Sequence, residues 1–255
     1  FLSSQTISLF GSALVQYSIM WYITLTTQSG IMMTLYIICG FIPTFLLSPF
    51  AGVWADRFNR KWLIMIADAM IAVVTLILAI VFLLGYEALW LLFVIAAVRA
   101  LGAGIQTPAV GAILPQIVPQ DQLTRVNGIN GTLQALIMFV APIASAALLT
   151  MATIEIIFFI DIITAAIAIL TLLFFLKIPL HQKAASAQTT GYLDDFKKGL
   201  DYIGQHAFLK TFFIFFAFFF VLMAPAAFLT PLQVTRTFGD DVWRLTAIEI
   251  AFSIG

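Results

Sequence analysis

Three charged side chains stand inside long apolar stretches of this sequence, where an isolated charge is costly. They are Asp68, Arg99 and Asp161. Arg99 lies near the middle of its stretch, and an arginine at the centre of a bilayer costs roughly 2.5–3.5 kcal/mol on insertion scales. Its guanidinium group must therefore face protein or water. Two roles follow for Arg99: a functional cation in a polar cavity, or the partner of a buried acid.

The two acids carry the chemistry of proton binding. Burial without a cationic partner favours the neutral form of a carboxyl group, a property that a proton-coupled carrier needs. Asp161 is the stronger candidate for that role, with a structural ion pair as its alternative. Asp68 lies closer to the basic residues Arg57, Arg60 and Lys61. We therefore favour a structural role for Asp68 beside them.

The first apolar stretch carries polar residues at helical spacing. Gln5, Ser8, Ser12 and Gln16 share one face. A polar stripe on a helix in lipid is expected to turn toward a cavity or a neighbouring helix. Gln5, Ser12 and Gln16 are therefore candidates for contact with a substrate.

The elements that must position these residues are membrane helices. Hydrophobic residues make up 62% of the chain and charged residues only 9%, a composition that excludes ordinary soluble domains. A spanning helix needs about 20 mostly apolar residues. The stretches that qualify are approximately 2–26, 31–54, 62–84, 89–115, 126–151, 154–176 and 208–230, and another begins near 245. The sequence predicts an all-α membrane protein.

Orientation follows from the Lys and Arg residues in the turns, which favour the cytoplasmic side. One side holds Arg57, Arg60, Lys61, Arg125, Lys177, Lys183, Lys197, Lys198 and Lys210. The other side holds only Arg236 and Arg244. The first side is therefore expected in the cytoplasm, together with the N-terminus.

One long polar segment divides the chain. We expect a six-helix bundle over 1–177, a cytoplasmic linker over 178–206 and the start of a second bundle over 207–255. Leu193, Phe196, Leu200 and Ile203 lie at helical spacing in the linker, which predicts an amphipathic helix at the membrane surface. A disordered loop is the alternative. Because neither end has a polar flank, we expect the chain to be a fragment of a longer protein.

A charged turn separates the second and third apolar stretches. It contains Gly52, Asp56, Arg57, Arg60 and Lys61 in the pattern Gly-x-x-x-Asp-Arg-x-x-Arg-Lys. Its basic residues would anchor the turn in the cytoplasm whatever the protein did. The whole pattern, however, resembles the signature loop of the major facilitator superfamily. In that loop the glycine permits close helix approach.

The resemblance extends to the branch of the superfamily that contains bacterial macrolide-efflux and enterobactin-exporter proteins. It rests on Ser4-Gln5 with Phe10 to Leu14, Ala67-Asp68, Thr107 to Ala109, Val118-Pro119 through Thr124, and Asp195 to Leu200. The resemblance implies two six-helix bundles that rock around a central site. It also implies a latch role for Asp56 against a helix of the second bundle, and it likens Arg99 to an arginine that recurs in the fourth span.

The fifth span resembles the antiporter motif of the superfamily only in part. Gly128 and Pro142 match and are expected at helix contacts, whereas Ser145 and Ala146 replace glycines. The motif alone therefore gives weak support to antiport.

The function implied by the resemblance is proton-coupled export of amphiphilic small molecules across the bacterial cytoplasmic membrane, by a monomer without organic cofactor. A siderophore or metabolite exporter is an alternative, as is a non-transporting receptor or assembly protein. No nucleic-acid partner is expected. The enzyme motifs His-Glu-x-x-His and Gly-x-Ser-x-Gly are absent from the sequence, and its two His residues and single Cys39 argue against a metal site.

Overall fold

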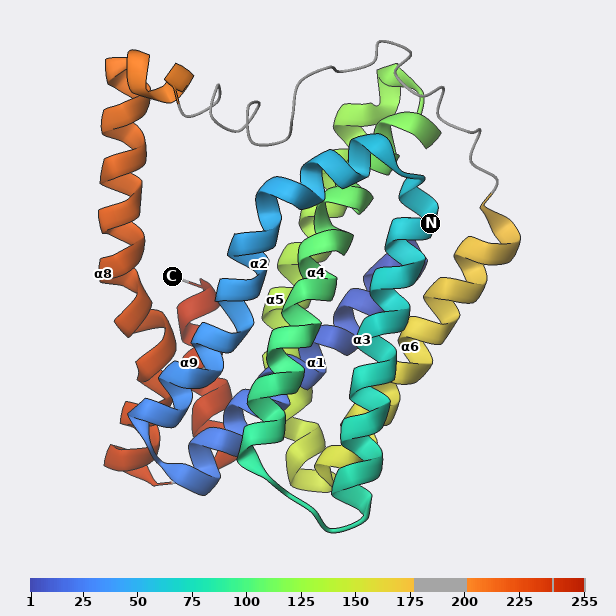
Figure 1. Cartoon of the computed structure of the whole chain (residues 1–255). Coiled ribbons are helices and arrows are strands. Elements are labelled where there is room, and N and C mark those ends of the chain that lie inside the picture. Colours follow the sequence, from blue (N-terminus) through green and yellow to red (C-terminus); the bar gives the residue numbers. More distant parts are fainter. Residues whose placement is uncertain (177–200, 240, 255) are drawn as a thin grey trace.

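The computed structural model describes residues 1–176, 201–239 and 241–254, and the regular elements in these ranges are helices (Figure 1). In chain order they are α1 (Leu2–Thr27), α2 (Gly30–Arg57), α3 (Arg60–Leu83), α4 (Leu89–Ile117), the 3-10 turn η1 (Gln120–Gln122), α5 (Leu123–Met151), α6 (Ile154–Phe175), α8 (Ala207–Phe238) and α9 (Val242–Ile254). The predicted all-α fold is confirmed. Most helices extend beyond the apolar stretches, because backbone hydrogen bonding continues into polar end residues.

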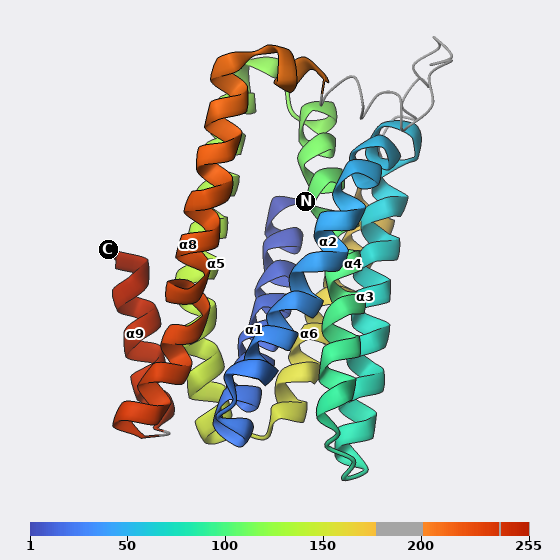
Figure 2. The same ribbon diagram turned by 60° about the vertical axis from the view of Figure 1, so that its left-hand side comes forward.

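Five helices of the described chain are long and apolar enough to cross a membrane. These are Gly30–Ser48, Arg60–Leu83, Leu89–Ile117, Gln120–Met151 and Ile154–Phe175. The helix α1 has 26 residues but is not among them, because its polar stripe lowers its hydropathy. Figure 2 shows α1 between α5 and α6, and α1 packs against both. Protein neighbours thus cover much of the helix that is least suited to lipid.

The first six helices pack in neighbouring pairs around one main apolar core. The most extensive contacts join α2 to α4, α3 to α4 and α6, and α1 to α5 and α6. The core contains Leu14, Ile19, Leu78, Leu92 and Phe158. Because α1, α3, α4 and α6 all meet there, a polar residue that points inward from any of them meets residues of the other three.

Two glycines allow the closest helix approaches. A methyl group on Gly11 would overlap the Thr164 hydroxyl oxygen and lie 3.1 Å from the Asp161 Cα on α6. A methyl group on Gly102 of α4 would lie 2.6 Å from the Ile71 side chain of α3. These glycines therefore set the distances from α1 to α6 and from α3 to α4 beside the buried charges.

The glycines expected at helix contacts behave differently. A methyl group on Gly52 or Gly128 would meet nothing within 4 Å among the described residues. The described residues thus provide no close neighbour at either position, and the helix-packing roles of Gly52 and Gly128 remain predictions. A motif identifies a glycine by its position in the sequence. Whether a larger side chain would fit there depends on the helix that lies opposite.

The helices α8 and α9 meet the first six helices mainly at the end opposite the Arg60–Lys61 turn (Figure 1). Trp21, Val234 and Leu245 are buried together there, and Arg236 donates a 2.7 Å hydrogen bond to the carbonyl oxygen of Gln28. Farther along α8, residues from Phe208 to Phe219 expose their side chains.

Most of the predicted linker lies outside the described residues. Residues 201–205 are helical, and 177–200 are not described. The amphipathic linker helix and the domain limits 1–177, 178–206 and 207–255 therefore remain predictions.

The packing at Gly11 predicts that Gly11→Ala destabilises the bundle. The new methyl group must push Thr164 and the α6 backbone away, and overpacking typically costs about 1–3 kcal/mol. The measurement is the thermal unfolding midpoint of the purified protein in detergent.

The matched control is Gly128→Ala, which removes a helical glycine in open space and should gain up to about 1 kcal/mol. Equal midpoints for the two variants would contradict the close contact between α1 and α6.

Candidate functional site

The centre of the bundle holds an ion pair between Arg99 of α4 and Asp161 of α6. The Arg99 Nη1 atom lies 2.5 Å from Asp161 Oδ2. Asp161 is fully buried, and Arg99 is 9% exposed. Arg99 and Asp161 are thus the two members of a buried ion pair, which was one of the two alternatives for each residue.

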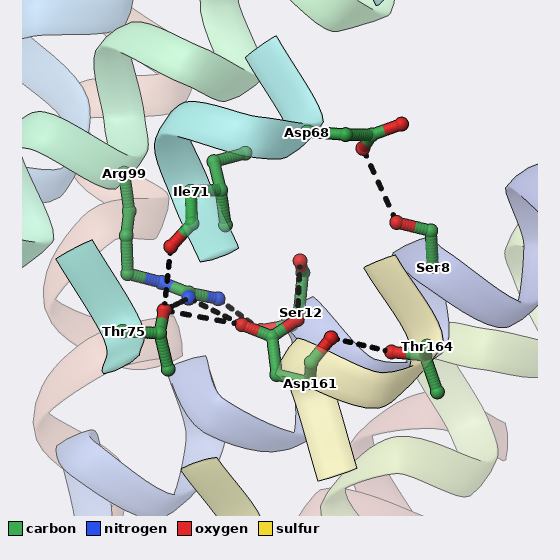
Figure 3. A network of polar contacts seen from close by, with 8 residues as sticks. All are labelled: Ser8, Ser12, Asp68, Ile71, Thr75, Arg99, Asp161 and Thr164. Carbon is green, nitrogen blue, oxygen red and sulfur yellow. Dashed lines mark hydrogen bonds and ion pairs between the residues drawn. The ribbon is translucent and has the colours of Figure 1, made fainter. Parts of the chain in front are cut away.

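Side chains from two further helices complete the coordination of Asp161 (Figure 3). The Ser12 hydroxyl of α1 donates a 2.9 Å hydrogen bond to Oδ1, and the Thr75 hydroxyl of α3 donates a 3.2 Å bond to Oδ2. Arg99 also donates to the Thr75 hydroxyl and, at 3.2 Å, to the Ser12 carbonyl oxygen. We call Ser12, Thr75, Arg99 and Asp161 the ion-pair layer, and it joins four helices.

The glycine contacts explain why this layer forms. Gly11 lets α1 approach the α6 backbone at Asp161, which brings the next residue, Ser12, within reach of the carboxylate. Burial of the pair removes both charges from water, and its geometry with added hydroxyl donors offsets that cost. The layer neutralises its own charges and fixes the relative positions of α1, α3, α4 and α6.

A second polar group lies one helical turn away along α1. The Asp68 Oδ1 atom accepts a 2.6 Å hydrogen bond from Gln106 Nε2 of α4 and a 3.2 Å bond from the Ser8 hydroxyl of α1. Gln106 Nε2 also lies 3.5 Å from Gln5 Oε1. We call Gln5, Ser8, Asp68 and Gln106 the amide layer. Asp68 is 1% exposed, and its Oδ2 atom is buried without a hydrogen-bond partner.

Asp68 does not bond the basic residues Arg60 and Lys61 beside which it was expected. Arg60 donates to the carbonyl oxygens of Ala55 at 2.8 Å and Ala112 at 2.6 Å. Lys61 donates to the carbonyl oxygens of Leu173 at 3.2 Å and Leu176 at 2.8 Å. Arg60 and Lys61 thus stabilise the C-terminal ends of α2 and α6, where backbone carbonyls lack intrahelical donors. Arg60 also joins α2 to the last two turns of α4 through Ala112.

The remaining residues of the charged turn are placed by the backbone. The helix α2 ends at Arg57, so Asp56 and Arg57 stand in its last turn. Asn59 begins α3, and its side chain accepts a hydrogen bond from the Lys61 amide. The latch role of Asp56 remains a prediction.

The polar stripe of α1 divides between two environments. Gln5 and Ser8 are buried, and Ser12 is half-buried at Asp161. Gln16 is exposed. Of the three predicted substrate contacts, Gln5 belongs to the amide layer and Ser12 to the ion-pair layer. Gln16 belongs to neither. The roles of all three in substrate binding remain predictions.

The fifth helix crosses α1 at small residues. Ser145 shares a 2.5 Å hydrogen bond with Ser18 and donates a 2.8 Å bond to the Leu14 carbonyl oxygen. Pro142 is buried beside it. Ser145, which replaces a motif glycine, therefore contributes a polar contact to this crossing. The helix-packing role of Pro142 remains a prediction.

Sequence reasoning overlooked two residues of these layers, Thr75 and Gln106. Gln106 follows Arg99 by two helical turns on the same face of α4, and Thr75 follows Asp68 by two turns on α3. This periodicity was the available signal. Within the described residues no group of three or more His, Cys, Asp or Glu side chains is arranged to hold a metal ion.

Comparison with known proteins agrees with this architecture. The profile of the Major Facilitator Superfamily matches residues 1–255. Macrolide efflux protein A of Streptococcus pyogenes is 27% identical over 253 residues, covering 99% of this chain and 62% of the relative. The protein of that name from Enterococcus faecalis is 27% identical, covering 85% of this chain and 67% of the relative.

A more distant relative is the Staphyloferrin A transporter of Staphylococcus aureus. It is 24% identical, covering 72% of this chain and 45% of the relative. The chain spans about three fifths of the length of the Streptococcus pyogenes protein, with 62% covered.

The ion-pair layer predicts strong coupling between Arg99 and Asp161. Arg99→Met leaves a buried carboxylate without its partner, and breaking a buried pair from one side costs about 3–5 kcal/mol. The double variant Arg99→Met with Asp161→Asn removes both charges and should be more stable than Arg99→Met alone. Thermal unfolding in detergent compares the unmodified protein, the single variants Arg99→Met and Asp161→Asn, and the double variant.

A double-mutant cycle interprets the result. Strictly additive effects of the two substitutions would contradict the pair.

Proposed function

Because the chain belongs to the Major Facilitator Superfamily, we propose that it forms part of a secondary active exporter that moves amphiphilic small molecules out of the cell in exchange for protons. Its apolar helices make it a multi-pass membrane protein, and its family consists of transport proteins rather than enzymes. We place it in a bacterial cytoplasmic membrane, with the Arg60–Lys61 turn on the cytoplasmic side, as a monomer.

The observation that carries this proposal is charge buried at the centre of the helices. Arg99, Asp161 and Asp68 are buried inside the bundle rather than exposed at lipid-facing positions. Ionisable residues within a membrane commonly mark ion or substrate pathways. Asp68 and Asp161 provide two carboxylates for proton coupling. The proton gradient supplies the energy, worth about 2.3 kcal/mol per charge per 100 mV.

The relatives support the substrate class. Two of them are macrolide efflux proteins by name, which favours macrolide-type substrates for this chain. The Staphyloferrin A transporter among the relatives supports a second candidate, export of an iron carrier or a similar metabolite.

Alternating access requires contacts that form in one state and break in the other. The hydrogen bond from Arg236 of α8 to the Gln28 carbonyl and the buried group of Trp21, Val234 and Leu245 join the two parts of the chain at the proposed outer end. We propose that this contact closes the outer side and separates when substrate leaves. Asp56, on the opposite side, would hold the outward-open state.

Uptake into everted membrane vesicles tests the function. Vesicles that contain a full-length transporter with this sequence should accumulate a radiolabelled macrolide, and a proton uncoupler should abolish the accumulation. A panel with siderophores and lipophilic cations distinguishes the substrate classes. Accumulation of none of these compounds, or accumulation that the uncoupler leaves unchanged, would reject proton-coupled export.

The signature turn yields a separate prediction for Asp56→Asn. Loss of the carboxylate should reduce macrolide uptake in the same vesicles about tenfold or more, the consequence of losing about 1.4 kcal/mol of selective stabilisation of one access state.

Asp121→Asn is the matched control, because Asp121 is an exposed acid in η1 at the same end of the bundle. Asp121→Asn should transport at the unmodified rate, and an Asp56→Asn protein that does so at equal abundance would refute the latch.

A further inference from the structure

We propose that Asp68 is the carboxylate in this part of the chain that binds and releases the transported proton, and that Gln106 and Gln5 position it. The inference rests on the proposed proton-coupled transport and assigns the proton to one of its two candidate acids. Asp161 instead serves as the permanent partner of Arg99.

The contacts of the two acids distinguish them. Asp161 binds Arg99 at 2.5 Å and accepts hydroxyl donors at both oxygens, so a proton that binds there must displace a guanidinium group. Asp68 forms no ion pair in the described part of the chain, and its contacts are the neutral Gln106 and Ser8. A proton can bind Asp68 without breaking any salt bridge.

Every helix packed against Asp68 supports this distinction. The helix α1 contributes the neutral Gln5 and Ser8. The charged groups of α4 and α6 that face the layer are Arg99 and Asp161, which bind each other. On α3 itself, Arg60 and Lys61 donate to backbone carbonyls at the helix ends. The described neighbours thus leave Asp68 without a fixed counter-ion.

The amide layer contains the atom on which the proton would reside. Asp68 Oδ2 is buried without a hydrogen-bond partner, and so is Gln5 Nε2. Both belong to one group, because Gln106 Nε2 contacts Asp68 Oδ1 at 2.6 Å and Gln5 Oε1 at 3.5 Å. Buried polar atoms without partners are rare, and the explanations for them include a catalytic role and a bound ion or water. Binding of a proton would complete this network.

A glutamine amide suits both states of a carboxyl group. Its NH2 group donates to a carboxylate, and after rotation its oxygen accepts from a carboxylic acid. Gln106 donates to Oδ1 in either state. Gln5 would donate to the charged form and accept from a new O–H bond at Oδ2. The layer therefore accommodates both forms without water.

The proton step is a simple transfer. A proton from water on the outer side bonds to Oδ2 and neutralises Asp68; later the O–H bond breaks and the proton returns to water on the cytoplasmic side. The layer is sealed in this conformation, since Asp68 and Gln5 are 1% and 2% exposed. Ser8 and Ser12 stand one turn apart on α1, so movement of α1 against α3 and α4 alters both layers together.

The test compares Asp68→Asn with the unmodified full-length transporter that contains this sequence. Asparagine keeps the size of the side chain and can still bond the neighbouring amides, but it cannot bind or release a proton. Reconstituted Asp68→Asn protein should keep exchange of radiolabelled macrolide across the liposome membrane, because exchange moves no net proton. It should lose accumulation driven by a membrane potential, about fifty-fold for one net charge at 100 mV. It should also lose the proton release that macrolide causes in weakly buffered detergent solution.

Asp121→Asn serves as the control and should retain all three activities, since Asp121 is exposed and distant from both layers. Retention of potential-driven accumulation and proton release by Asp68→Asn would overturn the assignment. The assignment would also be overturned if a sodium gradient drives macrolide accumulation by the unmodified protein and Asp68→Asn, but not Asp121→Asn, abolishes it. The carboxylate would then bind a metal cation instead of a proton. If the unmodified transporter moves another compound of the vesicle panel, that compound replaces the macrolide in all three measurements; if it moves none of them, the proposed function fails instead.

A second variant covers the case in which Asp68→Asn does not fold. Gln106→Met keeps the carboxylate and replaces its 2.6 Å amide donor with a side chain of similar length. It should shift the pH profile of macrolide-induced proton release, whereas loss of packing alone would lower the amount of folded protein at every pH. An unmoved profile overturns the role of Gln106 and, with it, the amide layer as the proton site.

Discussion

Charge buried in a bilayer must be compensated locally, and the arrangement of the described helices follows from that constraint. Arg99 lies at the centre of the bundle, so α6 must supply Asp161, and the pair must receive hydroxyl groups from α1 and α3. The hydroxyl of Ser12 reaches Asp161 only because Gly11 lets α1 lie against the α6 backbone. One ion pair thereby determines which helices are neighbours and where the smallest residue must stand.

The cations at the helix ends act by a related principle, with backbone carbonyls in place of carboxylates. Arg60 and Lys61 donate to terminal carbonyls of α2 and α6, and Arg236 donates to the Gln28 carbonyl after α1. Helix C-termini carry unsatisfied acceptors and partial negative charge. The basic residues that predict orientation therefore also stabilise the bundle, so the anchor and family explanations of the charged turn are compatible.

The sequence was sufficient to predict the helices and the presence of buried charge, because apolar length and hydropathy depend only on local composition. It identified Arg99 and Asp161 and allowed their pairing. It misplaced Asp68 because nearness along α3 to Arg60 suggested a partner, whereas Arg60 bonds backbone carbonyls and Asp68 bonds Ser8 and Gln106. Thr75 and Gln106 were overlooked because their partners stand on other helices. Helical periodicity gives the face of a residue, whereas its contacts depend on which helix lies opposite.

The free energies involved favour different roles for the two acids, with Asp68 as the proton-binding group and Asp161 as the partner of Arg99. Separating a buried ion pair costs about 3–5 kcal/mol, whereas one charge moving through 100 mV supplies about 2.3 kcal/mol. In a cycle that protonated Asp161, the free energy needed to release Arg99 would exceed what 100 mV supplies. Protonation would also weaken the contacts that hold four helices together. At Asp68 the change requires rotation of an amide and the exchange of one hydrogen bond, worth about 0.5–1.5 kcal/mol. Protonation of Asp68, whose partners are amides, therefore leaves the helix bundle intact. Protonation of Asp161 would break its ion pair with Arg99.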